Sequence, residues 1–284
     1  MLCRLAGMTR QNYYKQRALR QRAWVDEQLV LELIRRERCR QPQLGGRKLL
    51  HLCWGDMQSA QVPMGRDRFF ALLRREDLLI QRPKRGARTT DSRHRFAVYP
   101  NLAGSRVLTG PHQLLVSDIT YLRTQEGFMY LCLVMDAFSR AIVGHDCSDS
   151  LEMEGALRAL AQALRQLPTE VRGPGGGAMH HSDRGAQYCC GPYVERLRKA
   201  GVTISMTQQN HCYENSQAER LNGTLKREYA LGQTFASKAP VRPDVAEAVT
   251  LYNHHRPHQA LGYRFPIQVH RSWTPPPGPG PAAP

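Results

Sequence analysis

Hydrophobic positions in the middle of the chain gather into three short apolar runs. They are "QLLVSDITYL" at 113–122, "FMYLCLVMD" at 128–136 and "RAIVGHDCS" at 140–148, with turn-like stretches between them. Short runs rich in Val, Ile, Leu and Tyr are typical of buried strands. The pattern therefore predicts three consecutive strands.

Downstream, apolar residues recur at helical spacing and alternate with short strand-like runs. Leucines and alanines predict a helix over about 152–167, and the breaker run at 173–177 leads into a short strand ending near Asp183. Four further elements follow: a helix at about 191–200, a strand at 201–206, a long helix at about 214–230 and a helix at about 242–253. The order βββαβαβα indicates an α/β fold, a mixed sheet flanked by helices of the ribonuclease-H-like kind.

The first third of the chain reads differently, as helices with many basic residues. A helix is predicted over 24–39 after a short basic segment at 1–22, and two more over 43–54 and 64–80. Two short helices joined by a turn fit a helix-turn-helix. We therefore expect residues 1–81 to form a small basic helical, DNA-binding region. Its candidate contacts are Arg47, Lys48, Arg66 and Arg68.

Charge is concentrated in this first part. The formal net charge is +16, and residues 1–100 hold 22 Lys and Arg against 9 Asp and Glu. Such an asymmetry favours a polyanion-binding arm, although a merely solvated basic surface remains the alternative.

Residues 82–107 are interpreted as a basic linker. Its first half, 82–95, carries six Lys and Arg and one Asp. Lys84 and Arg85 are candidates for tracking a phosphate backbone, and a plain connector is the alternative. The last stretch, 271–284, is Pro-rich and is expected to be disordered.

Other features exclude some classes of protein. No apolar run approaches the roughly 18 residues of a membrane span, and the start of the chain has no signal-peptide core. None of the eight cysteines forms a CxxC pair, so we interpret them as reduced thiols. A cytoplasmic protein without a membrane partner is expected.

Three carboxylates stand out by their positions. Asp118 lies midway along the first predicted strand, where a charge is costly unless it is paired or binds a metal. Asp183 ends the fourth strand, and Glu219 follows in the long helix after 35 intervening residues. Taken singly, each has an ordinary explanation, as an arginine partner, a turn cap or a solvated helix residue.

The long helix has two distinct faces. Polar positions share one side of it: Asn215, Glu219, Asn222 and Lys226. An adjacent apolar stripe consists of Ala218, Leu221, Leu225 and Tyr229. If the stripe packs on the sheet, Glu219 turns toward Asp118 and Asp183.

Three carboxylates brought together repel one another unless cations neutralise them. Hard oxygen ligands suit Mg²⁺, with Mn²⁺ as a substitute, and two such ions support phosphodiester displacement. The sequence therefore predicts a two-metal site at Asp118, Asp183 and Glu219. A zinc site built from histidines at 180, 181, 254, 255 and 258 is a less favoured alternative.

Five motifs occur in order: "VSDITYL", "YLCLVMDAFSRAIVGH", "HHSDRGAQY", "SMTQQNHCYENSQAERLNGTLKREY" and "YNHHRPHQALGY". Over residues 108–270 they resemble the integrase catalytic core of bacterial DDE transposases, in particular the second-frame protein (OrfB) of the IS-three insertion-sequence family. "LGGRKL" and "REDLLIQRPKR" are more weakly similar to the helix-turn-helix of that family.

The resemblance implies roles for individual residues. Asp118, Asp183 and Glu219 match the DDE triad that binds two Mg²⁺ ions, while Asp136 matches an acid of the "DxFSR" motif that supports the site or the fold. Asn215, Asn222, Lys226 and Arg184 match positions expected to face DNA. "HHRPH" at 254–258 is expected to contact the helix carrying Glu219, or DNA.

The resemblance also implies an activity and partners. Such enzymes cleave transposon 3′ ends with water and use the 3′-OH in strand transfer, first joining one end to the other. Double-stranded DNA at the ends and target, a homo-oligomer on DNA, and an upstream-frame (OrfA) partner or frameshift fusion are implied, with a nucleoid-associated location. An inactive DNA-binding remnant and a nuclease without strand transfer are the rival hypotheses.

Overall fold

The computed structural model describes residues 7–80, 96–104, 106–173, 177–208, 215–272 and 274. The chain divides into two compact units, Met1–Pro83 and Lys84–Pro284. Lys84 and Arg85 lie outside the described residues, as does most of the Pro-rich stretch.

The first unit consists of three helices around one apolar core. They are α2 (Arg10–Arg40), α3 (Gly46–Ser59) and α4 (Arg66–Arg75). The core is formed by side chains from all three, among them Ile34, Leu49 and Phe69. The two short helices and the turn between them match the prediction.

Helix α2 begins earlier than the sequence indicated. The prediction treated residues 1–22 as a separate basic segment, but α2 already starts at Arg10. The Thr9 hydroxyl accepts a hydrogen bond from the Asn12 backbone N–H at 3.1 Å and so caps the helix. Since no Gly or Pro interrupts residues 10–22, nothing ends the helix there.

The second unit contains a five-stranded mixed sheet in the order β3-β2-β1-β4-β5. β1 pairs antiparallel with β2, as β2 does with β3, whereas β1–β4 and β4–β5 are parallel. The strands are β1 (Leu114–Thr124), β2 (Gly127–Asp136), β3 (Ile142–Ser148), β4 (Met179–Ser182) and β5 (Thr203–Met206). All five predicted strands are confirmed.

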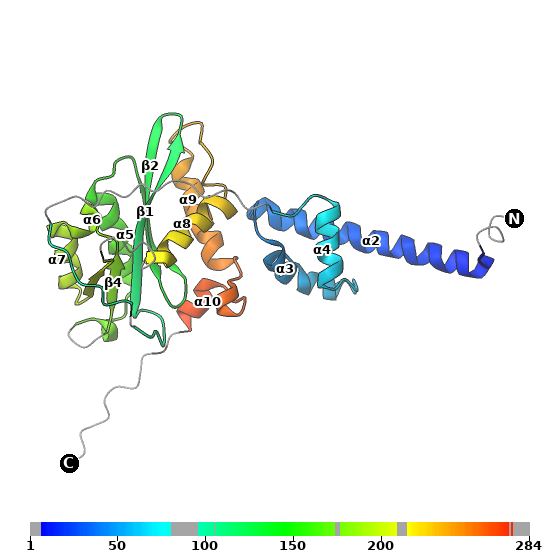
Figure 1. Ribbon diagram of the computed structural model, residues 1–284, viewed down its shortest axis with the longest axis horizontal. Helices are drawn as coiled ribbons and strands as arrows, with labels where there is room; N and C mark the ends of the chain where they lie inside the picture. Colours follow the sequence, from blue (N-terminus) through cyan, green and yellow to red (C-terminus); the bar gives the residue numbers. More distant parts are fainter. Residues whose placement is uncertain are drawn as a thin grey trace, which may run out of the picture. The chain divides into compact units, whose positions relative to one another are not determined.

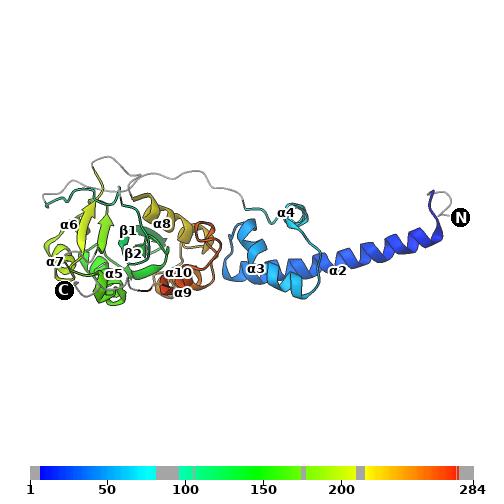
Figure 2. The ribbon, with the colours of Figure 1, turned by 90° about the horizontal axis from the view of Figure 1, so that it is seen from below.

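Helices cover both faces of this sheet (Figures 1 and 2). One face packs on α5 (Met153–Gln166) and α7 (Gly191–Lys199), and the other on α8 (Ser216–Glu228) and α9 (Val241–His254). Strand side chains alternate between the two cores: Leu115 faces α5 and α7, while Val116 faces α8 and α9. The predicted mixed sheet between helices is confirmed.

Four short elements were not predicted. They are the 3-10 turns η1 (Thr169–Val171) and η3 (Gln259–Leu261) and the helices α6 (Ala186–Cys189) and α10 (Pro266–Arg271). Each is too short to leave a periodic pattern in the sequence. Two of them, η3 and α10, contribute to the surroundings of the turn that follows β2.

The predicted linker 82–107 is described only in its second part. There the Leu102 and Ala103 backbone N–H groups donate to the Ser205 hydroxyl of β5, at 2.9 and 3.2 Å. The Met206 N–H donates to the Pro100 carbonyl at 3.3 Å. This part of the chain therefore lies against the edge strand β5 of the second unit.

Within the described residues, no helix has both the length and the apolar character required to cross a membrane.

At Gly144, the backbone of α5 comes very close to the sheet. A Cβ atom at this position of β3 would lie 2.1 Å from the Ala159 carbonyl oxygen. Only glycine lets the helix backbone come this near to the strand.

We expect Gly144→Ala to lower the free energy of unfolding by about 1–3 kcal/mol, since the backbone of α5 has to move away from β3. Chemical denaturation measures the change. Gly191→Ala is the control, because a Cβ there meets nothing within 4 Å. Equal stability of the two variants would contradict this close packing.

Candidate active site

The centre of the sheet holds Asp118 beside α8. Asp118 lies in the middle of β1, opposite Leu133 of β2, and is partly buried. Its Oδ2 accepts a hydrogen bond from the Asn222 amide of α8 at 2.7 Å, and its Oδ1 accepts one from the Ile119 N–H at 3.0 Å. These two hydrogen bonds therefore orient both oxygens of the Asp118 carboxylate.

Asp183 comes directly after β4, the parallel neighbour of β1. Its Oδ1 accepts a hydrogen bond from the Gly185 N–H at 2.9 Å, which shapes the start of the following loop. In that loop the Arg184 Nε donates to the Thr207 carbonyl at 2.7 Å. The parallel pairing of β1 with β4 brings this loop to the β1 side of the sheet.

Glu219 is an exposed residue in the first turn of α8. This helix is tied to its neighbours at both ends. At its start the Asn215 amide donates to the Ser117 carbonyl of β1 at 3.0 Å. At its end Glu228 accepts two hydrogen bonds from Arg256, at 2.6 and 3.0 Å.

Arg256 belongs to the "HHRPH" motif, so the expected contact between this motif and the Glu219 helix is present. The guanidinium also lies over the Tyr252 ring, 5.4 Å from its centroid. Both partners of the ion pair are largely buried, with side-chain exposures of 7% and 16%. Removing one partner of such a pair leaves an uncompensated charge, so the contact fixes α8 firmly.

The three carboxylates influence one another electrostatically. Burial first, and then the negative charges of Asp183 and Glu219, together raise the pKa of Asp118 to about 7, against the two hydrogen bonds that lower it. The sequence prediction that these three residues approach one another is therefore supported by their mutual charge effects. A donor set of carboxylate oxygens at a site that disfavours negative charge fits a hard divalent cation.

The other predicted contacts in this unit have different surroundings. Asn215 and Asn222 are buried and donate to β1, so their amides help to build the site, and their contact with DNA stays a prediction. Lys226 is partly buried, which lowers its pKa, while the nearby Asp118 charge raises it.

Arg47, Arg66 and Arg68 are exposed, and Lys48 is partly exposed. They lie at the starts of α3 and α4. Their predicted contact with DNA is untested.

Comparison with known proteins gives the family. Residues 109–212 and 200–266 match two family models, each described as an Integrase core domain. The chain is 34% identical over 266 residues to the "Insertion element IS600 uncharacterized 31 kDa protein" of Shigella sonnei, covering 92% of this chain and 94% of the relative. It is also 34% identical over 202 residues to "Transposase InsF for insertion sequence IS3A" of Escherichia coli K12, covering 70% and 68%.

The chain belongs to the insertion-sequence transposases of the IS3 type. Members of this family are polynucleotidyl transferases with an integrase core. The fold agrees: a simian T-cell lymphotropic virus intasome structure, 16% identical, matches 83% of this chain and 74% of its own with a TM-score of 0.50. At this low sequence identity, the likeness is evidence for a shared fold and for nothing further.

The transposase contains a second cluster that the sequence did not indicate. His112, Asp136 and His270 place one potential ligand atom each within 4.8 Å of one another, closer than the members of the Asp118 set among the described residues. His112 precedes β1, Asp136 ends β2, and His270 lies in α10. Because these positions are far apart in sequence, only the folded chain brings them together.

Both oxygens of the Asp136 carboxylate accept hydrogen bonds. Its Oδ2 accepts from the His112 backbone N–H at 2.6 Å, and its Oδ1 accepts from the N–H and hydroxyl of Ser139 at 2.7 and 2.6 Å. The Ser139 hydroxyl lies 3.1 Å from Nδ1 of His270. The cluster therefore joins α10 to the turn after β2, consistent with the supporting role inferred for Asp136.

Burial disfavours the charged form of both histidines of this cluster. Burial and the neighbouring His270 together lower the pKa of His112 to about 4, against a smaller opposing effect of Asp136. Burial also lowers the pKa of His270. Their rings lie 4.4 Å apart, so protonation of either would place a charge in a packed interior.

We expect Asp118→Asn to stabilise the metal-free transposase by about 2–4 kcal/mol at pH 8, because the charged form of this buried carboxylate destabilises the fold above its pKa. This stability gain of the variant shrinks as pH falls from 7 toward 4. Asp118 of the folded wild type is protonated in this range, so its destabilising charge is lost. Denaturant unfolding in chelator measures it. Asp244→Asn, at an exposed aspartate of the same unit, is the control. A destabilised Asp118→Asn would contradict the raised pKa.

We expect the stability difference between wild type and His112→Asn to narrow as pH falls. The folded protein resists protonation of His112 down to about pH 4, so wild type loses about 2 kcal/mol between pH 7 and 5 that the variant keeps. Asn tolerates the left-handed backbone at this position, where φ is 67°. Parallel pH profiles for the two proteins would rule out a buried neutral histidine.

Proposed function

We propose that this chain is the catalytic subunit of an insertion-sequence transposase that cleaves DNA 3′ ends and transfers them in a Mg²⁺-dependent reaction. One observation carries the proposal: the negative charges of Asp183 and Glu219 contribute to the raised pKa of Asp118, in a unit that matches integrase core models. Two relatives are named as transposases for insertion sequences, which supports the reaction class.

Asp118, Asp183 and Glu219 would hold two Mg²⁺ ions, with Mn²⁺ as a substitute. When bound, such ions make a water or a 3′-OH more nucleophilic and stabilise the leaving oxygen of the phosphodiester. The ions would also relieve the charge repulsion that raises the pKa of Asp118.

Other residues would prepare this site. Asn222 holds one oxygen of Asp118, which leaves its second lone pair to a cation. Asn215 ties the start of α8 to β1 directly beside Asp118, and the Glu228–Arg256 pair fixes the other end of that helix. Glu219 is thereby presented from a rigid element, as a metal ligand requires.

Double-stranded DNA is the proposed substrate, at the transposon ends and at the target. In this division of the chain, residues 1–81 bind DNA, 82–107 link, 108–270 catalyse and 271–284 form a tail. The proposed contacts are Arg47, Lys48, Arg66, Arg68, Lys84, Arg85, Arg184 and Lys226. Because two DNA ends must be joined, we also propose a homo-oligomer on DNA, assisted by an upstream-frame partner.

We expect Glu219→Gln to reduce cleavage and joining by about a thousandfold or more while DNA affinity is retained, since the change removes one ligand charge and keeps the side-chain shape. The assay follows a labelled duplex carrying the element's terminal sequence, with Mg²⁺ and, in a second arm, with the upstream-frame protein. Glu154→Gln, an exposed glutamate in α5, is the matched control.

Joined products from wild type and Glu154→Gln only would support the proposal. Hydrolysis without joining would indicate a nuclease. Failure of wild type in both arms, with DNA binding preserved, would favour an inactive DNA-binding regulator of transposition.

A further inference from the structure

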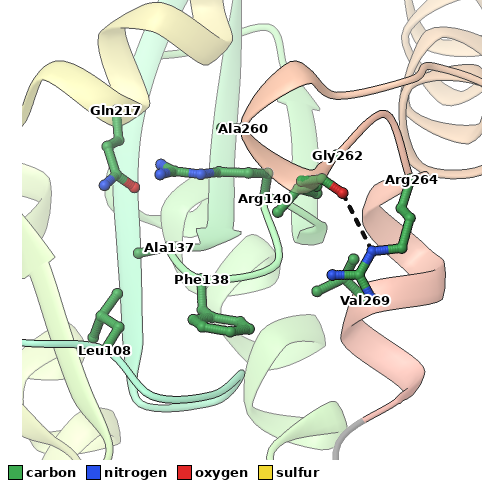
Figure 3. A pocket seen from close by; sticks show the side chains of 10 residues that line it. Leu108, Ala137, Phe138, Arg140, Gln217, Ala260, Gly262, Arg264 and Val269 are labelled. Atoms are coloured by element: carbon green, nitrogen blue, oxygen red, sulfur yellow. Dashed lines mark hydrogen bonds between the residues drawn. The ribbon is translucent and has the colours of Figure 1, made fainter.

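A cavity of about 610 Å³ lies in the second unit beside the start of α8 (Figure 3). Five segments line it: the chain before β1 at Leu108, the turn after β2, the first turn of α8, the loop around η3, and α10 at Val269. The polar side chains facing it are Arg140, Gln217 and Arg264, and Phe138 and Leu261 contribute apolar surface. No residue of the acidic site or of the His112 cluster is among the lining residues.

Arg140 is the unusual member of this cavity. Its side chain is partly buried, and its Nε has no hydrogen-bond partner within the part of the chain that the structure describes. Burial lowers its pKa, and the positive charge of Arg220 lowers it further, despite Asp136 and Tyr252. Asp136 already accepts three hydrogen bonds from other groups, and no carboxylate of the described residues forms an ion pair with this guanidinium.

The backbone holds Arg140 in this position. Its φ is 64°, an uncommon value for a residue other than glycine, and its N–H donates to the Asp136 carbonyl at 2.9 Å. The Asp136–Ser139 hydrogen bonds stabilise the same turn. The fold therefore keeps a cation at a half-buried place where an unpaired charge is costly.

The other two polar groups suit an anion as well. Gln217 has a buried Oε1 without a hydrogen-bond partner among the described residues, and its amide can present N–H donors instead after rotation. Arg264 is exposed and uses its Nε on the Leu261 carbonyl at 3.2 Å, with its remaining N–H donors available to a ligand (Figure 3). The cavity also adjoins the N-terminal, positive end of α8.

We propose that this cavity binds a phosphodiester group of DNA held on the enzyme, through Arg140 and Arg264. The inference rests on the proposed function and adds a second contact to it. Gln217 and Glu219 lie in the same turn of α8 but on different sides, so a strand held at the acidic residues continues past the helix start. Arginine suits this task because its planar fork matches phosphate oxygens.

The experiment compares wild type with Arg140→Gln and Arg264→Gln, and with Arg165→Gln as a charge-matched control at an exposed position of α5. Anisotropy of a labelled terminal-sequence duplex is measured across a salt series. Each cavity variant is expected to bind about three- to tenfold more weakly and to lower the slope of log affinity against log salt by about 1. Arg165→Gln is expected to keep the affinity and the slope of wild type.

Thermal unfolding distinguishes a binding role of Arg140 from a structural one. Replacing an unpaired, half-buried charge is expected to leave the melting temperature unchanged or raise it. A lower melting temperature together with a wild-type salt slope would assign Arg140 to the fold and overturn the proposal. So would wild-type affinity and slope in both cavity variants.

Inorganic phosphate serves as the second probe. If it stabilises wild type but not Arg140→Gln, while all variants bind the duplex equally, the cavity takes a free anion and the DNA proposal is wrong. The cleavage assay separates the two hypotheses. If wild type cleaves DNA and both cavity variants bind it as wild type does, this inference alone is wrong. If the variants change the affinity and the salt slope but wild type cleaves no DNA, the proposed function alone is wrong.

Discussion

The proposed active site of this enzyme depends on holding three like charges near one another despite their repulsion. Asp118, Asp183 and Glu219 come from a central strand, a strand end and a helix, and the burial of the first makes its negative charge unfavourable. Like-charged side chains in this arrangement would move apart if the strands and the helix that carry them were flexible. The surrounding structure accordingly consists of short, specific ties rather than apolar packing alone. Asn222 and Asn215 bind α8 to β1, and the Glu228–Arg256 pair binds its end to the segment after α9. These directed contacts prevent α8 from sliding over the sheet.

The turn between β2 and β3 links this region to the rest of the unit. Asp136 organises the turn through Ser139 and receives the His112 N–H, and α10 closes over it with His270. The adjoining Ile142 exchanges two hydrogen bonds with Asn253 of α9, both at 2.9 Å. The segment from Asp136 to Ile142 thus contacts the edge strand β3, the helices α9 and α10, and holds Arg140 in place. An acid that the sequence marks as merely supportive is, in the fold, the centre of this arrangement.

The sheet and its flanking helices followed from residue patterns because period-two and helical spacing report burial directly. Asp118 was conspicuous as a charge inside an apolar strand, and its place in the middle of β1 beside α8 is confirmed, while its joint role with Asp183 and Glu219 stays a prediction. The cluster around Asp136 was not predictable, because His112 lies in a loop and His270 in a six-residue helix 158 positions later, and neither segment leaves a pattern in the sequence. Asn222 was expected on the DNA-facing side of its helix, and only tertiary packing shows its amide directed at Asp118.

Fixing α8 at both ends has a mechanical consequence. A helix anchored to β1 at its first residues and to Arg256 at its last cannot tilt or rotate without breaking a charged or buried contact. In the proposed active site, a change in the distance between Glu219 and the other two carboxylates would then come from rotation about side-chain bonds. The helix backbone thus stays in place, and the Glu219 side chain is the part that can move.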